Sequence, residues 1–195
     1  MNSDLLQLRT YLQRATIRPA GGREIEARWG VTKAQFYQVM QKLTSEPPRR
    51  EFYRDTAYPS TTGRLRRREV FERAETTGSS VSAPLRIEWT LKEVQGQPYI
   101  SKDFGYLVSV ATETTVPVSQ GKAGDVRSSY RSSVLAVDGL QIDFIEEVAP
   151  AKYRIEAELV GGSTELLVEW VPRILSLIQQ SHIPISLSER AAVIK

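Results

Sequence analysis

Between residues 50 and 159 of this chain, apolar side chains recur at every second position. The clearest run contains Leu85, Ile87, Trp89 and Leu91. Because successive side chains of a β-strand point to opposite faces, this period of two indicates strands. Similar runs occupy residues 106–113, 126–135, 140–148 and 153–160. Asp138-Gly139, between two of these runs, is typical of a hairpin turn. We therefore expect six to eight antiparallel strands that form a barrel or a sandwich.

Three segments outside this region have apolar residues at helical spacing: residues 4–14, 33–43 and 163–180. The side chains placed to cap these helices are Ser3 or Asp4, Thr32 and Ser163. Pro172 lies within the last segment, where it would kink the helix or mark its true first turn. A length of 195 residues is that of one domain, so we expect a single domain over residues 1–195 with a barrel core at about residues 22–160.

The scarcity of some residue types restricts the chemistry available to the chain. It has no cysteine, which excludes disulfides, thiolate zinc sites and a thiol nucleophile. Its single histidine, His182, argues against a histidine-rich metal site and against a Ser-His-Asp hydrolase. No apolar run approaches the length of a membrane span, and the N-terminus lacks a signal-peptide core. We expect an intracellular protein without membrane contact, whose chemistry depends on carboxylates, lysines, arginines and a bound metal.

Several predicted strands carry charged residues on the face opposite their apolar side chains. A strand near the N-terminus places Glu24 and Glu26 on one face, and a strand near the other end of the region places Glu156 and Glu158 likewise. Two carboxylates on one strand face lie roughly 7 Å apart. They are then near enough to share a hard cation, so each pair could contribute to a metal site.

Basic residues line other strands in the same way. The alternating positions are Arg64, Arg66 and Arg68, then Arg127 and Arg131, with Arg86 and Lys92 on a further strand. For any single strand, the ordinary interpretation is a solvated outer face. Two Glu-x-Glu strands together with three basic strand faces favour the opposite arrangement. In that arrangement the charged faces point into a barrel, and helices cover its apolar outer face.

An ionic tunnel of this kind has a definite chemistry. Clustered carboxylates repel one another unless a cation binds between them, and hard oxygen ligands suit Mg²⁺ or Mn²⁺. Arginine and lysine side chains on the opposite wall would hold a polyphosphate. A metal that bridges carboxylates and a terminal phosphate, beside basic groups that neutralise developing charge, supports phosphoryl transfer to water.

The sequence resembles the triphosphate tunnel metalloenzymes, and among them the metal-dependent RNA 5′-triphosphatases of mRNA capping in fungi, protozoa and large DNA viruses. The Glu-x-Glu strands that begin at Glu24 and Glu156 carry the resemblance. The stretches that support it are Arg64-Leu65-Arg66 after Asp55 and Tyr58, residues 108–113 followed by Pro117, and residues 127–131 followed by residues 141–144. The resemblance covers about residues 22–180, and the short length suits a small, viral-like member.

The resemblance implies a mostly β fold of the α+β class, namely a closed eight-stranded antiparallel β-barrel with flanking helices. It implies removal of the γ-phosphate from 5′-triphosphate RNA, the first step of mRNA capping, with hydrolysis of free nucleoside triphosphates as a side activity. The partners it implies are the 5′-triphosphate end of nascent RNA, nucleoside triphosphates and an mRNA guanylyltransferase. A monomer or homodimer is expected, in the nucleus or a viral replication compartment.

The resemblance also implies roles for individual residues. The ligands of Mg²⁺ or Mn²⁺ would be Glu24, Glu26 and Glu158, and Glu156 would orient the attacking water. The phosphate contacts would be Arg64, Arg66, Arg127, Arg131 and a tunnel lysine, for which Lys92 fits the strand alternation better than Lys102. Asp143 and Glu113 would hold basic side chains or the water network in place. The chain departs from the family pattern at Ser129, where a lysine is common, and at Leu107, where a basic residue is frequent.

Two other functions remain open. Relatives that act on thiamine triphosphate, tripolyphosphate or adenine nucleotides begin with Glu-x-Glu-x-Lys, and the chain is close to this pattern with Arg28 at the last position. Residues 127–144 favour the capping branch. Barrel subunits of transcription complexes share the fold without catalysis but lose the glutamates, which this chain keeps. Among the remaining residues we expect His182 at the surface, and in the core Trp29, Trp89 and Trp170.

Overall fold

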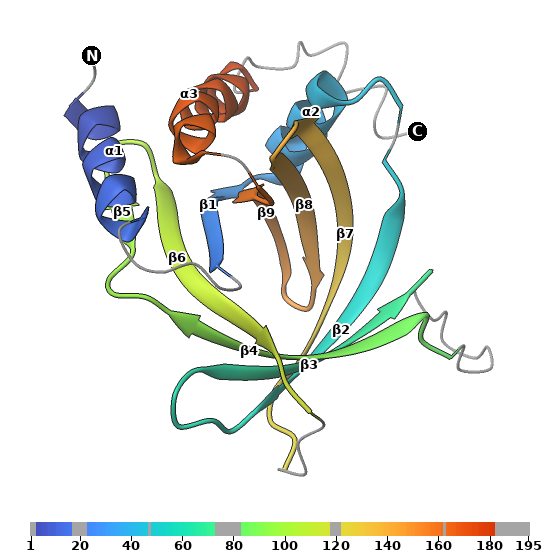
Figure 1. The fold of residues 1–195 in the computed structure, drawn as a ribbon. Helices are drawn as coiled ribbons and strands as arrows, with labels where there is room; N and C mark the ends of the chain where they lie inside the picture. Colours follow the sequence, from blue (N-terminus) through green and yellow to red (C-terminus); the bar gives the residue numbers. More distant parts are fainter. Residues whose placement is uncertain are drawn as a thin grey trace, which may run out of the picture.

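The computed structural model describes residues 3–16, 23–46, 48–72, 83–117, 122–161 and 163–181, so His182 falls outside the described part. Within that part, nine strands form one antiparallel sheet (Figure 1): β1 (Arg23–Val31), β2 (Arg50–Tyr58), β3 (Arg64–Phe71), β4 (Arg86–Val94), β5 (Tyr99–Ser101), β6 (Tyr106–Thr115), β7 (Val126–Val137), β8 (Leu140–Val148) and β9 (Ala151–Leu159). Three helices accompany the sheet: α1 (Ser3–Thr16), α2 (Lys33–Leu43) and α3 (Thr164–Gln180).

Eight of these strands close into a barrel. Their order is β1-β9-β8-β7-β2-β3-β4-β6, and β6 pairs back to β1 with Ile25 opposite Val110. The short strand β5 lies outside this ring, where it pairs with the beginning of β6. Gly139 ends the turn between β7 and β8 at a φ of 85°, a conformation that favours glycine. The predicted closed eight-stranded barrel is therefore confirmed, as is the hairpin at Asp138-Gly139, and the alternative of a sandwich is wrong.

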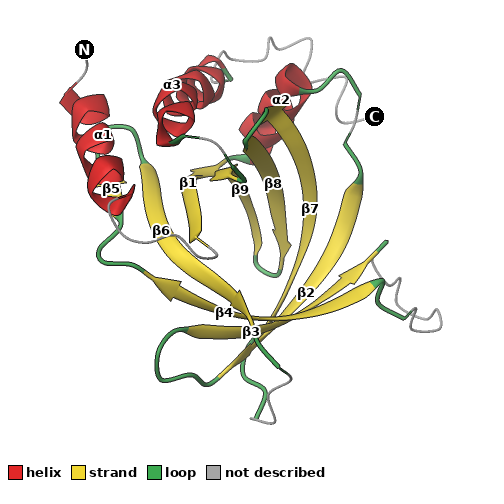
Figure 2. Cartoon of the chain, viewed as in Figure 1, coloured by secondary structure: helices red, strands yellow, loops and turns green. Residues whose placement is uncertain are grey.

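The apolar core lies outside the barrel, between its outer face and the three helices. Figures 1 and 2 show the helices together on the side of β1, β8 and β9, with β2, β3 and β4 on the opposite side. Among the largest fully buried side chains are Trp29, Phe144, Ile155, Leu8 and Ile174. The helices contribute to this core with one face each, and none of those described has the length and apolarity needed to cross a bilayer.

Helix ends agree with the predicted caps in two of three cases. Thr32 forms a capping box with Gln35 at the start of α2, and Ser163 accepts a hydrogen bond from the backbone of Glu165 at the start of α3. Because α3 begins at Thr164, Pro172 lies inside the helix and does not mark its first turn. In α1, Asp4 is buried and its carboxylate accepts hydrogen bonds from two tyrosine hydroxyls of the sheet, so it does not cap the helix.

The outer face of β4 is less covered than the sequence predicted. Leu85 and Ile87 are 55% and 49% exposed, although their alternation resembles that of a buried strand face. Trp89, which we expected in the core, is only half-buried and packs on Tyr58 with the ring centroids 4.8 Å apart. The prediction that helices cover the apolar outer face therefore holds for one side of the barrel only. Trp29 and Trp170 are buried as expected.

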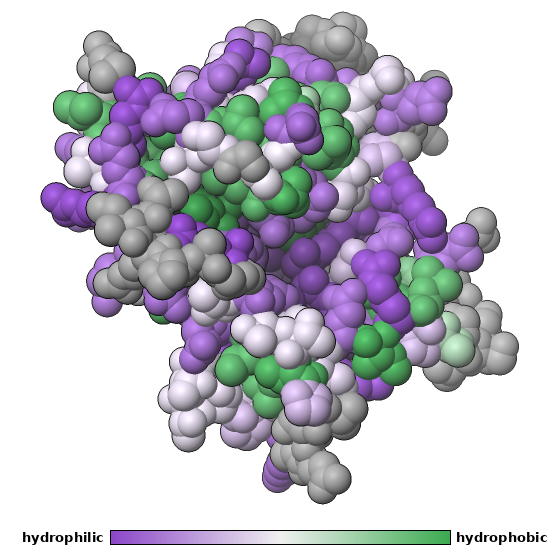
Figure 3. All heavy atoms as spheres, in the orientation of Figure 1, coloured by the Kyte–Doolittle hydropathy of each residue, from purple (hydrophilic) through white to green (hydrophobic). Residues whose placement is uncertain are grey.

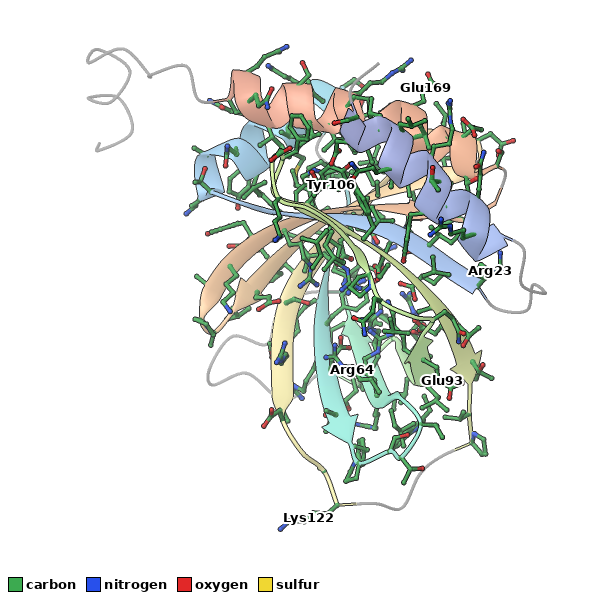
Figure 4. All side chains as sticks on the ribbon, turned by 90° about the vertical axis from the view of Figure 1, so that its left-hand side faces the viewer. Arg23, Arg64, Glu93, Tyr106, Lys122 and Glu169 are labelled. Atoms are coloured by element: carbon green, nitrogen blue, oxygen red, sulfur yellow. The ribbon has the colours of Figure 1, made fainter. Side chains whose placement is uncertain are left out.

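We expect Asp4→Ala to lower the free energy of unfolding by about 1.5–3 kcal/mol at pH 7, since charge-assisted hydrogen bonds contribute in that range. The Tyr99 and Tyr106 hydroxyls donate to its carboxylate at 2.6 and 2.5 Å, and Tyr106 lies between the sheet and the helices (Figure 4). Burial raises the pKa of Asp4, but these hydrogen bonds outweigh burial and lower it below 3.8. The stabilisation is therefore present above pH 3.8 and is lost as pH falls through the lowered pKa.

Urea denaturation of wild type and Asp4→Ala at pH 7 and at pH 2–3 checks this prediction, with the exposed Gln7→Ala of the same helix as the control. An equal difference between wild type and Asp4→Ala at both pH values would contradict it.

Candidate active site in the barrel interior

The barrel encloses a cavity of about 530 Å³ whose wall is mainly charged. Figure 3 shows hydrophilic side chains in the hollow at the centre of this view, and Figure 4 shows side chains converging inside the ring of strands. The basic residues of the wall are Arg23, Arg28, Arg64, Arg66, Arg68, Lys92, Arg127, Arg131 and Arg154. The acidic residues are Glu24, Glu26, Asp55, Glu113, Glu147, Glu156 and Glu158. The expected inward orientation of the charged strand faces is thus what the structure shows.

The acidic wall is formed where β1 pairs with β9. Glu26 and Glu158 are direct cross-strand partners, and Glu26 is only 2% exposed. Lys92 reaches this wall from β4, and its Nζ lies 2.7 Å from Glu24 Oε1 and 2.8 Å from Glu26 Oε1. The Ser109 hydroxyl also donates to Glu26 Oε1, at 3.2 Å. The structure therefore places Lys92 inside the tunnel, in agreement with the strand alternation.

The carboxylates of this wall have unequal electrostatic surroundings. Burial and the charge of Glu26 raise the pKa of Glu24 to about 8. Burial and three neighbouring carboxylates, of which Asp143 has the largest effect, raise the pKa of Glu158 to about 7. Burial would raise the pKa of Glu26 as well, but the charges of Arg28 and Lys92 outweigh burial, so the pKa of Glu26 is lowered. The wall thus holds more negative charge than its cationic neighbours compensate.

The donor set of this wall fits a hard divalent cation. Glu24 Oε2 is buried without a hydrogen-bond partner, and Glu158 makes no ion pair within the described part of the chain. As placed, no three carboxylate or imidazole groups among the described residues are gathered into a metal site. Instead, the Lys92 ammonium lies between two of the carboxylates, in the role that a cation would have. The residues whose carboxylate oxygens could hold Mg²⁺ or Mn²⁺ are Glu24, Glu26 and Glu158.

Glu156 is contacted by two arginines. Its Oε1 lies 3.1 Å from Arg28 Nε and 2.7 Å from Arg154 Nε, and the carboxylate is buried. Arg154 also contacts Glu147 at 3.1 Å. We had not predicted Arg28 or Arg154 as site residues. Both lie two positions from a predicted glutamate on the same strand face, so the alternation itself was the signal that could have found them.

A second ionic group lies on β2, β3 and β6. Arg68 donates two hydrogen bonds of 2.8 Å to the carboxylate of Asp55, and Arg66 Nη1 lies 3.7 Å from the same group. Arg66 also donates to Glu113 Oε1 at 2.9 Å. Burial alone would raise the pKa values of Asp55 and Glu113. The neighbouring arginines outweigh burial, so both pKa values are lowered. Glu113 thus contacts a basic side chain, the role that the resemblance implies for it. Arg68, which the alternation placed on the same basic face without a role of its own, is held by Asp55.

Asp143 differs from this pattern. It is buried opposite Glu156, and its Oδ1 accepts a hydrogen bond of 2.9 Å from the Gln141 amide. No ion pair to a basic side chain is found for Asp143 among the described residues. Its position beside Glu158 instead adds negative charge to the acidic wall.

Three arginines of the cavity wall have no carboxylate partner within the described residues: Arg64, Arg127 and Arg131. Arg64 and Arg127 are exposed, and Arg131 lies deeper on the same strand as Arg127. Guanidinium groups that are free of carboxylates can bind phosphate oxygens bidentately. The cavity therefore has one wall with an excess of carboxylates, suited to a cation, and another wall with guanidinium groups unpaired among the described residues, suited to an anion.

No protein-family model matches the sequence, and no curated protein matches it. Among solved structures, the fold is similar to that of the RNA triphosphatase domain of a trifunctional mimivirus mRNA capping enzyme. The TM-score is 0.63 at 14% identity, and the match covers 88% of this chain and 96% of the mimivirus domain.

Two further solved structures are similar in fold. The S. pombe RNA triphosphatase in complex with the Spt5 CTD matches with a TM-score of 0.57 and 12% identity, over 100% of this chain and 92% of that protein. A putative adenylate cyclase of Bacillus halodurans matches with a TM-score of 0.54 and 18% identity, over 85% and 96%. At these identities the likeness establishes the fold, which is that of the triphosphate tunnel.

Proposed function

We propose that this chain, which has the triphosphate tunnel fold, is a metal-dependent triphosphatase that removes the γ-phosphate from 5′-triphosphate RNA. The observation that carries the proposal is the division of the cavity inside the barrel into a carboxylate wall and an arginine wall. A triphosphate needs cationic groups along its length, and hydrolysis needs a water held at its terminal phosphorus. RNA as the substrate is supported by the fold similarity to the mimivirus and S. pombe RNA triphosphatases.

The chain's own residues supply binding and orientation. Arg64, Arg127 and Arg131 would contact phosphate oxygens, since none of them is engaged by a carboxylate in the described structure. Arg66 is held by Glu113 and Asp55, so its guanidinium is fixed before the substrate arrives. Fixed cationic groups of this kind stabilise the charge that develops on the phosphoryl oxygens.

The metal would be held by the acidic wall. Glu24, Glu26 and Glu158 are the proposed ligands, and Mg²⁺ or Mn²⁺, when bound, would neutralise phosphate charge and act as a Lewis acid. Lys92 lies between two of these carboxylates and would contribute a further positive charge beside the phosphates. Glu156 is the proposed residue for orienting water, and Arg28 and Arg154 hold its carboxylate in place.

The experiment that tests the proposal follows phosphate release from γ-labelled triphosphate RNA, with Mg²⁺ and with Mn²⁺, beside tripolyphosphate and ATP. We expect metal-dependent release that is faster from RNA than from ATP. The product, a 5′-diphosphate RNA end, is the substrate of an mRNA guanylyltransferase, which would place the protein in the nucleus or a viral replication compartment. Absence of release from every substrate by the folded protein would contradict the proposal.

A second candidate function is hydrolysis of a small polyphosphate. Arg28 favours it, because Glu24, Glu26 and Arg28 line the cavity on one strand in a pattern close to that of the small-polyphosphate enzymes. The same experiment separates the two candidates, since release from tripolyphosphate without release from RNA would identify this second function.

A further inference from the structure

Arg131 has an unusual environment for an arginine in the cavity wall. Its side chain is half-buried, and its Nε, like those of Arg66 and Arg154, is buried without a hydrogen-bond partner. Arg66, Arg68 and Arg154, in the same wall, are each held by at least one carboxylate. Arg131 makes no ion pair with any described residue, and the group that its guanidinium does contact is an aromatic ring.

That group is the ring of Tyr53 on β2. The Arg131 guanidinium carbon lies 5.2 Å from the centroid of the Tyr53 ring, and the Arg68 guanidinium carbon lies 5.0 Å from the same centroid. Both distances lie within the range in which a guanidinium is attracted to an aromatic ring. Tyr53 therefore joins Arg131, which has no carboxylate, to Arg68, which is fixed by Asp55.

The ring of Tyr53 is itself held firmly. Its side chain points into the barrel, since it is two positions from Asp55 on β2, and only 8% of the residue is exposed. Its hydroxyl donates to Glu51 Oε2 at 2.9 Å and accepts from Arg86 Nη2 at 3.3 Å. Two polar groups at the rim thus fix the hydroxyl end, and the ring presents its surface to the arginines.

We infer that Tyr53 is a positioning residue, which orients Arg131 for phosphate binding without using the hydrogen-bond donors of its guanidinium. The inference rests on the proposed function, because it takes Arg131 as a phosphate contact. A carboxylate in place of the ring would also fix the guanidinium, but it would occupy the donors and repel the phosphate. An aromatic ring attracts the guanidinium as a whole and leaves its N–H groups directed toward the cavity.

The inference is tested by the binding of inorganic tripolyphosphate to the metal-free protein, measured by titration calorimetry in EDTA. We expect Tyr53→Leu to weaken binding about tenfold, the effect of losing a partly buried cation–π contact. Tyr53→Phe keeps the ring and should bind within about twofold of wild type, although it loses both hydroxyl hydrogen bonds. A merely structural role would make both variants weak binders. Tyr53→Met provides a second variant without a ring, in case Tyr53→Leu does not fold.

Two controls make the assignment specific to Arg131. Phe52→Leu alters a neighbouring ring of equal exposure on the opposite face of β2, so it should lower stability without changing tripolyphosphate affinity. In a double-mutant cycle with Arg131→Ala, the effect of Tyr53→Leu should disappear.

Four results would overturn the inference, the first being weak tripolyphosphate binding by Tyr53→Phe as well as by Tyr53→Leu. Unchanged binding by Tyr53→Leu would overturn it alone, as would a Tyr53→Leu effect that persists in the Arg131→Ala background. Wild-type protein that does not bind tripolyphosphate would overturn it together with the proposed function. Hydrolysis assays stay separate from this measurement, since tripolyphosphate can bind in the arginine wall even if the chain does not cleave RNA.

Discussion

Glu158→Gln is expected to reduce triphosphate hydrolysis at least a hundredfold and, at the same time, to make the metal-free fold more stable. The two effects have one cause. Glu158 lies opposite Glu26, near Asp143 and Glu156, and has no ion pair among the described residues. Its charge is therefore unfavourable to folding, and glutamine removes that charge with little change in shape. A residue kept at a cost in stability is typical of a functional site.

The size of each effect follows from general magnitudes. Removing one electrostatic partner from an active site costs about 10²–10³ in rate. Burial, the larger cause, and like charges raise the pKa of Glu158 to about 7, which corresponds to an unfavourable free energy of about 1–2 kcal/mol for the charged side chain after allowance for solvent access. Phosphate release and urea denaturation in EDTA at pH 8 provide the two measurements. The exposed Glu165→Gln on α3 is the matched control: it should leave hydrolysis unchanged and, because it removes only a surface ion pair with Arg9, should lower stability by at most about 1 kcal/mol.

Hydrolysis by Glu158→Gln at more than a tenth of the wild-type rate would show that Glu158 is not one of the metal ligands needed for the reaction. A loss of stability in this variant would instead show that the carboxylate has a favourable partner.

Asp55→Ala is expected to lower the free energy of unfolding by about 3–5 kcal/mol, the usual cost of removing one partner of a buried ion pair. Asp55 accepts both hydrogen bonds from Arg68, which is 8% exposed, and lies close to Arg66. Without Asp55, Arg68 loses its carboxylate partner and faces Arg66, on the adjacent inward position of β3, which keeps only Glu113 as a partner. Chemical denaturation of wild type and variant at pH 7 measures the loss.

A matched double substitution separates this explanation from simple loss of packing. In Asp55→Leu/Arg68→Met both partners of the pair are replaced by apolar groups, so no buried charge of the pair remains unpaired. We expect this variant to recover at least half of the stability that Asp55→Ala loses. A loss under about 1 kcal/mol in Asp55→Ala would mean that water, and not Asp55, solvates Arg68.

The strands were predictable because a period of two is a local property, but the coverage of their faces was not. The alternation correctly assigned Ile87 and Trp89 to one face, yet it could not show whether a helix lies over that face. The strand β5 was missed because three residues are too few to show a period. The closure of β6 onto β1 depends on pairing between distant segments, so it followed from the family resemblance and not from the local pattern.

The sequence predicted which residues line the site better than it predicted which of them contact one another. Glu24, Glu26 and Lys92 were expected in the tunnel, and the structure brings them together. Lys92 bridges the two glutamates because of the registers in which β4 and β1 pair with β6, and no local pattern reveals these registers. Tyr53 was missed because an aromatic residue at an alternating position is normally interpreted as core. Its actual surroundings are charged, since its face of β2 also carries Asp55.

The pairing of β6 with β1, which closes the barrel, affects how the chain folds. Among the strands that the structure describes, β1 pairs with β6 and β9, both far along the chain, so these pairings of β1 are long-range contacts. Folds dominated by such contacts form slowly, because the entropy of the intervening loop is lost before the contacts form. Glu24 and Glu26 lie on this strand, and Lys92 comes close to them through β6, which pairs with both β4 and β1. The acidic wall therefore forms only when β1 has found both β6 and β9, so a partly folded species that lacks either pairing lacks part of the proposed metal site.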